Sequence, residues 1–502
     1  MYDAVFLTDH IDYLPTSMLP IGAFKCAHVL RTKGYKCLVV SNITSFSNEE
    51  LDELFFYSIG PNTKFVGFST TFIWVENDGL VHQDQGLSEN SLIDKIKKRN
   101  PTTKIVLGGT KSHLDLKNKN IDYAIIGYGE TSVVNLMNHL DNNSSLRNSF
   151  KNINGVTIIN DKLAPAYDFT KDVMRWLPED VVNYRVLPIE MARGCIFKCK
   201  FCAHMLTGKK KLDYVKEYDV MREELMQVYN DFGITNYMIT DDTFNDNVEK
   251  LEHIHNITQS LPKQLKLWAY LRLDLINAHP KTLPMLSEIG IRACHFGIET
   301  MHPDAAKVVG KGQDREKLLD TLSYMELHNS EISKHGSFIV GLPYEPRESS
   351  IDTAEKLLSG KIPLNSFSWQ PLRIQKSNTF QNDSEFDREW QKYGYKEVSY
   401  LDRTHLFNNV SLNWQNEHWI FQDAYDYVSA LYQRAQQSDH YFFEGLWSLG
   451  MHSYHNINKD TTFNNLRQKL FKEVDMQFLN RVKDAFTNEY KHKLFKILDR
   501  GF

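Results

Sequence analysis

The sequence has 502 residues, 42% of them hydrophobic and 24% charged, which is ordinary globular composition and predicts two to about four folded domains rather than a disordered chain. Its 58 basic and 63 acidic side chains leave a net charge of −5, so a protein that follows nucleic-acid phosphates is not expected. No signal-peptide pattern opens the chain, and no apolar run approaches the roughly 20 residues that cross a bilayer. We therefore expect a cytoplasmic protein with no membrane partner.

Residues 1–150 alternate short apolar runs with amphipathic stretches. Helices are expected at 23–33, after Ser47, near 92–98 and after Glu130. Five strands are expected, at 4–7, 37–40, 65–69, 105–109 and 123–127. This alternation predicts a Rossmann-like domain, in which helices cover both faces of a parallel sheet. Ligands of such sheets bind beyond the carboxyl ends of the strands.

The alternation pauses over 151–185, where a short strand at 155–159 and several prolines predict a linker. It restarts in residues 186–375, where helices such as 220–232 and 317–328 separate the expected strands. These six strands are expected at 188–191, 237–240, 267–271, 293–297, 337–340 and 367–369. They predict a partial (β/α)6 TIM-like barrel with its chemistry at the strand carboxyl ends.

Residues 376–502 carry many aromatic residues at amphipathic spacing, which predicts a mainly helical C-terminal cap. A base-stacking platform is the alternative interpretation. It is disfavoured because such platforms accompany a basic groove, and the sequence shows none. We therefore expect no nucleic-acid partner.

Three of the six cysteines, Cys195, Cys199 and Cys202, fall within eight positions directly after an expected strand. In a reducing compartment such a group indicates a metal site rather than disulfides. Thiolates are the natural ligands of iron–sulfur clusters, and three of them leave one iron of a 4Fe–4S cluster open to a small molecule. The alternative is a zinc site, for which His204 is the nearest candidate fourth ligand.

The C-x3-C-x2-C spacing, with Phe201 before the last cysteine, resembles the radical S-adenosylmethionine (SAM) superfamily, most closely over 186–375. The resemblance implies a 4Fe–4S cluster held by the three cysteines, with SAM bound at the open iron. It also implies that one electron, from an external donor of the flavodoxin or ferredoxin type, cleaves SAM to a 5′-deoxyadenosyl radical. No catalytic acid or base is assigned by the resemblance.

Strand-end segments in the barrel extend the resemblance. Asp241 and Asp242 resemble the acidic motif that holds the methionyl amine, whereas Asp242 or Asn245 would equally serve as a helix N-cap. Arg272 resembles an arginine that pairs with the methionyl carboxylate, and an ordinary ion pair is the alternative. The resemblance assigns to the SAM site Phe201, Asp242, Arg272, Glu299 (at the ribose), and Ile339 and Gly341 (at the adenine).

Residues 1–150 resemble, more loosely, the cobalamin-binding domain of one radical SAM subfamily. The sequence lacks the D-x-H-x-x-G loop that supplies a histidine to cobalt in other cobalamin proteins. Many members of the radical subfamily also lack this loop, so cobalamin is still an expected cofactor. The resemblance implies cobalamin contacts from Ser69, Gly108, Gly109, Gly127, Gly129 and Glu130.

Together these resemblances imply cobalamin-dependent methylation of an unactivated carbon in a small molecule or peptide. Without cobalamin, a radical rearrangement, cyclisation, dehydrogenation or epimerisation is the alternative. A non-enzymatic cobalamin or cluster sensor is disfavoured because it would not need the strand-end motifs for SAM. A methylthiotransferase is disfavoured because its second cluster needs three N-terminal cysteines, and only Cys26 and Cys37 lie there.

Overall fold

The chain divides into two compact units. The first contains Met1–Pro188, Gln227–Ile234 and Lys472–Phe502, and the second contains Ile189–Met226 and Thr235–Phe471. Residues 472–502 therefore group with the N-terminal part of the chain, although they lie in the range expected as a C-terminal cap. The computed structural model describes residues 1–9, 19–71, 75–76, 79–80, 89–109, 120–151, 155–161, 167–203, 212, 214–311, 314–375, 383–398, 412–438 and 476–499.

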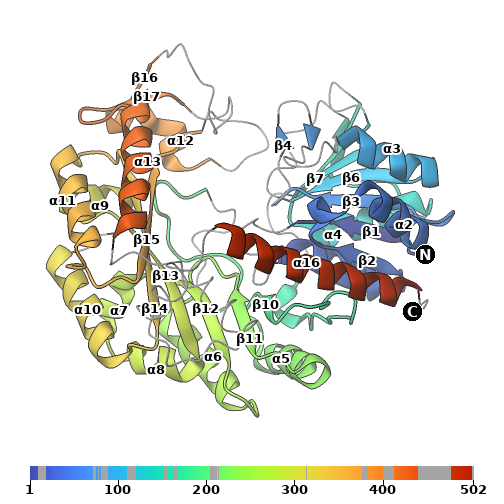
Figure 1. Cartoon of the computed structure of the whole chain (residues 1–502), viewed down its shortest axis with the longest axis horizontal. Helices are drawn as coiled ribbons and strands as arrows, with labels where there is room; N and C mark the ends of the chain where they lie inside the picture. The colour runs from blue at the N-terminus through green and yellow to red at the C-terminus, as the bar shows by residue number, and fades with distance from the viewer. Residues whose placement is uncertain are drawn as a thin grey trace. The chain divides into compact units, whose positions relative to one another are not determined.

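A seven-stranded sheet forms the centre of the first unit (Figure 1). The strand order is β2-β1-β3-β6-β7-β9-β8, and all neighbours are parallel except β8 and β9. The order reverses between β1 and β3, which is the switch point beside which doubly wound sheets bind ligands. The strands are β1 (Ala4–Leu7), β2 (Cys37–Val40), β3 (Phe65–Ser69), β6 (Lys104–Gly108), β7 (Tyr123–Gly127), β8 (Ser149–Lys151) and β9 (Thr157–Asp161).

All five strands expected in residues 1–150 are present, and the parallel sheet confirms the predicted Rossmann-like fold. The strand expected at 155–159 corresponds to β9, which pairs with β7 and so extends this sheet. A small hairpin of β4 (Val75–Glu76) and β5 (Gly79–Leu80) lies outside it.

Four helices connect the parallel strands. The helix expected after Ser47 begins with a capping box: Ser47 Oγ accepts a hydrogen bond from the Glu50 amide (3.2 Å), and Glu50 Oε2 accepts one from the Ser47 amide (2.7 Å). Short 3-10 turns are formed by Ile43–Ser45 and Phe169–Lys171. The helices are α1 (Ile21–Arg31), α2 (Asn48–Ser58), α3 (Glu89–Arg99) and α4 (Gly129–Leu140).

The C-terminal helix α16 (Met476–Asp499) packs beside α2 in the same unit. The Ser41 amide, just beyond β2, donates to the Tyr490 hydroxyl at 3.0 Å, and Asn42 Nδ2 donates to the Thr487 hydroxyl at 3.0 Å. The end of the chain therefore covers the carboxyl end of β2.

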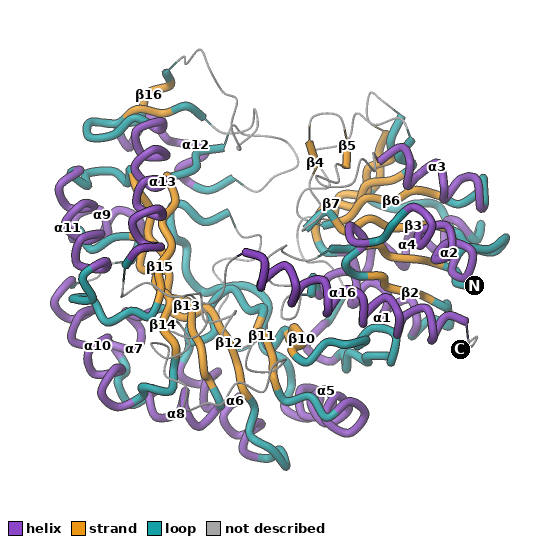
Figure 2. The backbone as a smooth tube through the Cα atoms, viewed as in Figure 1, coloured by secondary structure: helices purple, strands orange, loops and turns teal. Residues whose placement is uncertain are grey.

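A six-stranded sheet has the order β10-β11-β12-β13-β14-β15, and neighbours from β11 to β15 are parallel. It belongs to the second unit except for residues 186–188 of β10, which fall in the first. Strands that follow chain order confirm the predicted partial barrel (Figure 2). The strands are β10 (Val186–Ile189), β11 (Asn236–Ile239), β12 (Lys266–Leu271), β13 (Ile291–Glu299), β14 (Ser333–Val340) and β15 (Ser366–Pro371).

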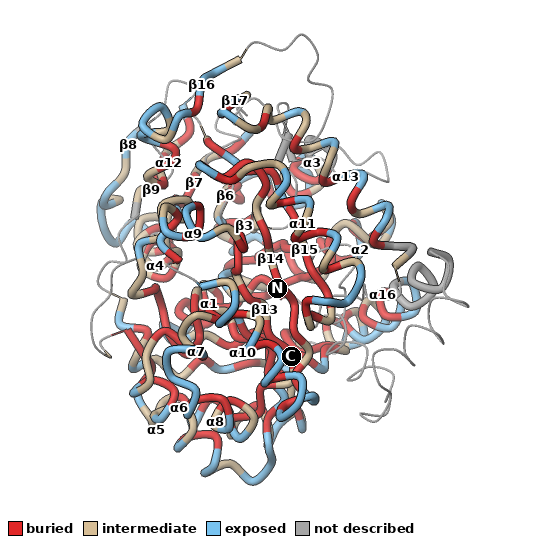
Figure 3. Tube along the Cα trace, turned by 90° about the vertical axis from the view of Figure 1, so that its left-hand side faces the viewer, coloured by how far each residue is buried: buried red, intermediate tan, exposed pale blue. Residues whose placement is uncertain are grey.

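Helices follow these strands and lie on the outer side of the sheet (Figure 2). Figure 3 shows buried residues running along β13 and β14, whereas the helix surfaces alternate between buried and exposed. The helices are α5 (Tyr218–Phe232), α6 (Val248–Gln259), α7 (Leu273–Ala278), α8 (Thr282–Ile289), α9 (Pro303–Val309), α10 (Arg315–His328) and α11 (Arg347–Leu358). This packing directs the strand carboxyl ends and their loops to one edge of the barrel.

The expected C-terminal cap is described in part. Buried Trp414 and Tyr395 belong to this region, and the aromatic residues over 441–447 lie outside the described residues. No helix within the described ranges is long and apolar enough to cross a membrane. The elements are α12 (Glu385–Glu389), a 3-10 turn (Trp390–Tyr393), β16 (Lys396–Glu397), β17 (Trp414–Gln415) and α13 (Phe421–Gln437).

Candidate active site

The three clustered cysteines lie on the loop that follows β10. Asp241, at the end of β11, accepts hydrogen bonds at 2.9 Å from the amides of Met191 and Ala192, where this loop begins. Cys195 is buried, and burial raises the pKa of its thiol. The Phe197 amide donates to Cys195 Sγ at 3.4 Å, so the loop folds back over its own first cysteine.

A buried charged network supports this loop from β11. Lys250 on α6 is fully buried, and its Nζ lies 3.1 Å from Asp241 and 3.2 Å from Asp246. The same Nζ donates to the Thr243 carbonyl at 2.9 Å, and the Thr243 hydroxyl contacts Cys195 Sγ at 3.4 Å. Removing Lys250 would leave two buried carboxylates without their cation, so the network ties the cysteine loop to β11.

The two adjacent aspartates have different positions. Asp241 is turned to the backbone of the cysteine loop, whereas Asp242 lines a cavity at the strand ends. The N-cap of α6 is Asn247, so the N-cap alternative for Asp242 and Asn245 was wrong for this helix. Asn245 instead holds the backbone of Arg272, with Asn245 Oδ1 accepting from its amide (2.8 Å) and Asn245 Nδ2 donating to its carbonyl (2.9 Å).

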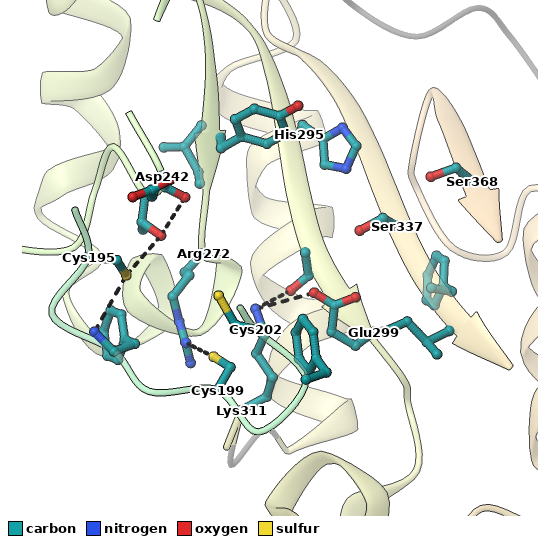
Figure 4. A pocket seen from close by; sticks show the side chains of 18 of the residues that line it. Cys195, Cys199, Cys202, Asp242, Arg272, His295, Glu299, Lys311, Ser337 and Ser368 are labelled. Carbon is teal, nitrogen blue, oxygen red and sulfur yellow. Dashed lines mark hydrogen bonds and ion pairs between the residues drawn. The ribbon is translucent and has the colours of Figure 1, made fainter. Parts of the chain in front are cut away.

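All three cysteines line this cavity, whose volume is about 440 Å³ (Figure 4). Five of the six residues assigned to SAM from the sequence line it as well: Phe201, Asp242, Arg272, Glu299 and Ile339. Because these residues come from the cysteine loop and from four different strand ends, only the barrel fold brings them together.

Glu299 is held beside a lysine that the sequence did not single out. Lys311 Nζ lies 3.6 Å from Glu299 Oε1 and donates to the Gly297 carbonyl at 2.7 Å. Burial raises the pKa of the Glu299 carboxyl group, and Lys311 opposes that rise. A Cβ atom at Gly297 would lie 2.5 Å from the Glu299 carboxylate, so the G-x-E spacing leaves room for this ion pair.

Ile339 and Gly341, both expected at the adenine, lie in different surroundings. Ile339 lines the cavity, whereas Gly341 is not among its lining residues. Gly341 has φ of +89°, and a Cβ atom there would overlap the Trp414 ring. Its carbonyl accepts hydrogen bonds from the Tyr395 hydroxyl (2.6 Å) and Asn416 Nδ2 (3.0 Å), so it packs against the C-terminal region of the unit.

The opposite wall of the cavity is polar, and sequence reasoning missed it. Tyr270 and Ser337 lie two positions before Arg272 and Ile339, and every second residue of a strand points to the same face. Counting back by two from Arg272 and Ile339 would have found these two residues, whereas counting back by two from Glu299 reaches Gly297 rather than His295. The wall consists of Tyr270, His295, Ser337, Ser368 and Gln370.

The donor set fits an iron–sulfur cluster, because three thiols line one cavity beside two groups that hydrogen-bond to sulfur. Within the described ranges, no group of three or more His, Cys, Asp or Glu side chains is arranged to hold a metal ion, so the fit to a cluster rests on the thiols that share the cavity and not on a ligand geometry. His204, the fourth ligand in the zinc alternative, lies outside the described residues.

The residues assigned to cobalamin gather at the carboxyl edge of the first sheet. Ser69 and Gly108 are register partners at the ends of β3 and β6, and Gly127 ends β7. No atom lies within 4 Å of a Cβ built at Gly108, so there is open space beyond this strand end. Gly109 has φ of +94° and lies close to the Thr70 backbone. A Cβ atom built at Gly109 would be only 3.0 Å from the Thr70 amide nitrogen.

Gly129 and Glu130 begin helix α4 at the same edge. A Cβ atom at Gly129 would lie 2.5 Å from Cys26 Sγ, so packing against α1 already accounts for this glycine. Glu130 is buried. Gly129 therefore has a structural role whether or not a ligand binds.

The second unit is a partial barrel that carries three cysteines on the loop after its first strand. The family model described as the Radical SAM superfamily matches residues 189–357, so this part of the chain is similar to that superfamily. The match contains β11 to β14 and the last residue of β10, and it ends before β15.

Curated relatives divide between two kinds of chemistry. An uncharacterized methyltransferase of Pyrococcus horikoshii is 28% identical over 200 residues, covering 38% of this chain and 41% of the relative. The anaerobic magnesium-protoporphyrin IX monomethyl ester cyclase of Cereibacter sphaeroides is 24% identical over 267 residues, covering 50% of this chain and 41% of the relative. The chain thus spans about two fifths of the length of these relatives.

Solved structures share the fold over nearly the whole chain. The radical SAM methyltransferase TsrM from Kitasatospora setae, solved with tryptophan substrate and a SAM analog, matches with a TM-score of 0.66 at 14% identity, covering 94% of this chain and 99% of that one. The cobalamin-dependent SAM radical enzyme OxsB, solved with aqua-cobalamin and SAM, has a TM-score of 0.57 at 14% identity, covering 99% of this chain and 72% of that one. Both units therefore have the folds of cobalamin-dependent radical SAM proteins.

Proposed function

We propose that this chain is a radical SAM enzyme that cleaves SAM reductively at a 4Fe–4S cluster. The observation that carries the proposal is the shared cavity of Cys195, Cys199 and Cys202 with the residues expected to hold SAM. The reduced cluster would supply the electron that breaks a carbon–sulfur bond of SAM to give the 5′-deoxyadenosyl radical. A flavodoxin- or ferredoxin-type protein would deliver that electron.

Side chains of the cavity would hold SAM by charge and by shape. The Asp242 carboxylate would attract the methionyl ammonium group, and the Glu299 carboxylate would accept hydrogen bonds from the ribose hydroxyls. Phe201 and Ile339 would offer apolar surface to the adenine. Lys311 is ion-paired with Glu299 and would oppose the rise in the pKa of that carboxyl group that burial causes.

We further propose that the first unit binds cobalamin and that the reaction is methylation of an unactivated carbon in a small molecule or peptide. The order of the first sheet, with its switch point at β1 and β3, supports a ligand at this edge. Open space beyond Gly108 and the fold shared with TsrM and OxsB support the same assignment.

A second candidate is radical cyclisation or rearrangement. The relative that covers half of this chain is a cyclase, which favours this candidate. The two candidates differ in the fate of the SAM methyl group, since only methylation consumes it.

The test uses anaerobically purified chain, loaded with iron, sulfide and hydroxocobalamin, then given a chemical reductant and SAM with a deuterated methyl group. We expect 5′-deoxyadenosine by mass spectrometry only when the reductant is present. We expect S-adenosylhomocysteine in addition when cobalamin is bound. 5′-Deoxyadenosine without S-adenosylhomocysteine would favour the second candidate instead.

Two cysteine variants make the assignment specific. Cys195→Ala should lose the cluster absorption and all 5′-deoxyadenosine, because it removes a ligand. Cys294→Ala is the matched control: Cys294 is buried in β13, its thiol donates to the Ser333 carbonyl at 3.4 Å, and it does not line the cavity. Cleavage at the wild-type rate by Cys195→Ala would contradict the proposed function.

A further inference from the structure

Arg272 makes contacts that differ from those expected of a residue reserved for SAM. Its Nη1 donates to Cys199 Sγ at 3.3 Å, and this hydrogen bond is drawn in Figure 4. Its Nε and Nη2 donate to the two carboxylate oxygens of Asp274, at 3.1 Å and 2.6 Å. Nη2 also donates to the Gly310 carbonyl at 3.4 Å. Four of the five guanidinium N–H groups thus have acceptors within the chain.

The guanidinium is also fixed in orientation. The Phe197 ring, two residues before Cys199 in the cysteine loop, lies under it with the ring centroid 4.0 Å from Cζ. Asn245 holds the Arg272 backbone at both its amide and its carbonyl. Arg272 is 5% exposed, so it meets Cys199 in a site of low effective dielectric. A cation held this firmly against a thiolate has a charge-assisted hydrogen bond that does not need to be reorganised.

We infer that Arg272 is a positioning residue for the cluster, which holds the Cys199 thiolate by a charge-assisted hydrogen bond and raises the cluster reduction potential, rather than the residue that binds the methionyl carboxylate of SAM. This inference rests on the proposed function, because it requires a cluster on Cys199. Hydrogen bonds to cluster sulfurs and nearby charge set the potentials of iron–sulfur proteins. The reduced cluster carries one more negative charge than the oxidised cluster, so a cation at the thiolate favours reduction.

Asp274 allows the direction of the shift in cluster potential to be tested. Its carboxylate partly cancels the charge of Arg272 at 2.6 Å. Removing the positive charge should shift the cluster potential to more negative values, whereas removing the negative charge should shift it to more positive values. If Arg272 only supported the loop, replacing Arg272 and replacing Asp274 would not shift the cluster potential in opposite directions.

The experiment measures the midpoint potential of the reconstituted cluster, without SAM, by redox titration followed by electron paramagnetic resonance. Arg272→Met should lower the potential by about 59 mV or more, which is a tenfold change for one electron. Asp274→Asn should raise it. Arg315→Met is the matched control, because Arg315 pairs with Asp352 at 2.9 Å in the same barrel and is not among the residues that line the cavity.

Iron and sulfide content distinguishes a failure of this inference from a failure of the proposed function. A wild-type chain that holds no cluster would refute the proposed function itself. With clusters at equal occupancy in all variants, the opposite shifts and a SAM affinity within about twofold of wild type in Arg272→Met support the inference. An unchanged potential together with a tenfold loss of SAM affinity in that variant would overturn it and return Arg272 to the methionyl carboxylate.

Discussion

The Glu345 carboxyl group is buried where the chain passes from β14 into α11, and only 1% of the residue is exposed. Burial raises its pKa to about 7, and hydroxyl groups of Thr300, Ser349 and Ser350 oppose the rise. The unfolded chain would titrate this group near its ordinary value of 4.5. Because the folded pKa is the higher one, the folded state loses stability as pH rises from about 4.5 to about 7.

Replacing Glu345 by glutamine should remove this pH dependence. Glu345→Gln should unfold at nearly the same urea concentration as wild type at pH 5 and at a higher concentration at pH 8, with a difference of up to about 3 kcal/mol. Tryptophan fluorescence would follow the unfolding. Exposed Glu348→Gln is the control and should show little difference between the two pH values. Parallel loss of stability in Glu345→Gln and wild type would contradict the buried-acid interpretation.

At the scale of elements, the end of β14 is joined to β17 by packing rather than by strand pairing. Trp414 lies against Gly341, and its Nε1 donates to the Leu372 carbonyl at 2.7 Å just beyond β15. A glycine is required at this strand end by two independent conditions, the positive φ and the space taken by the indole ring. These contacts explain the glycine without a ligand.

Two glycine variants separate these conditions. Gly341→Ala should lower stability by about 2–4 kcal/mol, because it adds steric overlap to the cost of the backbone conformation. Gly34 has the same φ of +89° with no atom within 4 Å of a built Cβ, so Gly34→Ala should cost only about 1 kcal/mol. Thermal unfolding would measure both. Equal losses in the two variants would show that the Trp414 contact is unimportant for stability.

At the scale of the whole molecule, the chain combines two mainly parallel sheets, each with candidate ligand-binding residues at its strand carboxyl ends. The prediction for the first sheet can be tested while the second serves as an internal reference. Cobalamin content reports on the first unit, and iron content reports on the second.

Gly108→Val should block cobalamin with little effect on the fold, because the added side chain enters open space at the end of β6. We expect about tenfold weaker binding of hydroxocobalamin, or ~1.4 kcal/mol, with unchanged iron content. Lys104→Val is the control at the amino end of the same strand, where a half-exposed ion pair with Asp122 contributes little. Absorption spectroscopy after gel filtration would measure both cofactors. Full cobalamin retention by Gly108→Val would place the cofactor away from the end of β6.

Much of this molecule was predictable because the relevant patterns are local. The alternation of strands and helices predicted both sheets, since each element is specified by a few neighbouring residues. The cysteine loop was predictable for the same reason: its three thiols lie within eight positions. The strand-end motifs were also found, because in a parallel barrel every strand carries its functional residues to the same edge.

The tertiary structure alone decided which member of each motif does which task. Asp241 and Asp242 are neighbours in the chain, but in the loop beyond β11 one is turned to the cysteine loop and the other lines the cavity. Lys311 and Trp414 reach Glu299 and Gly341 across separations that no local pattern records. Helix α16 joins the first unit for the same reason, since it contacts residues more than 400 positions earlier. Local sequence specifies elements, whereas long-range packing and charge pairing assign the partners of each side chain.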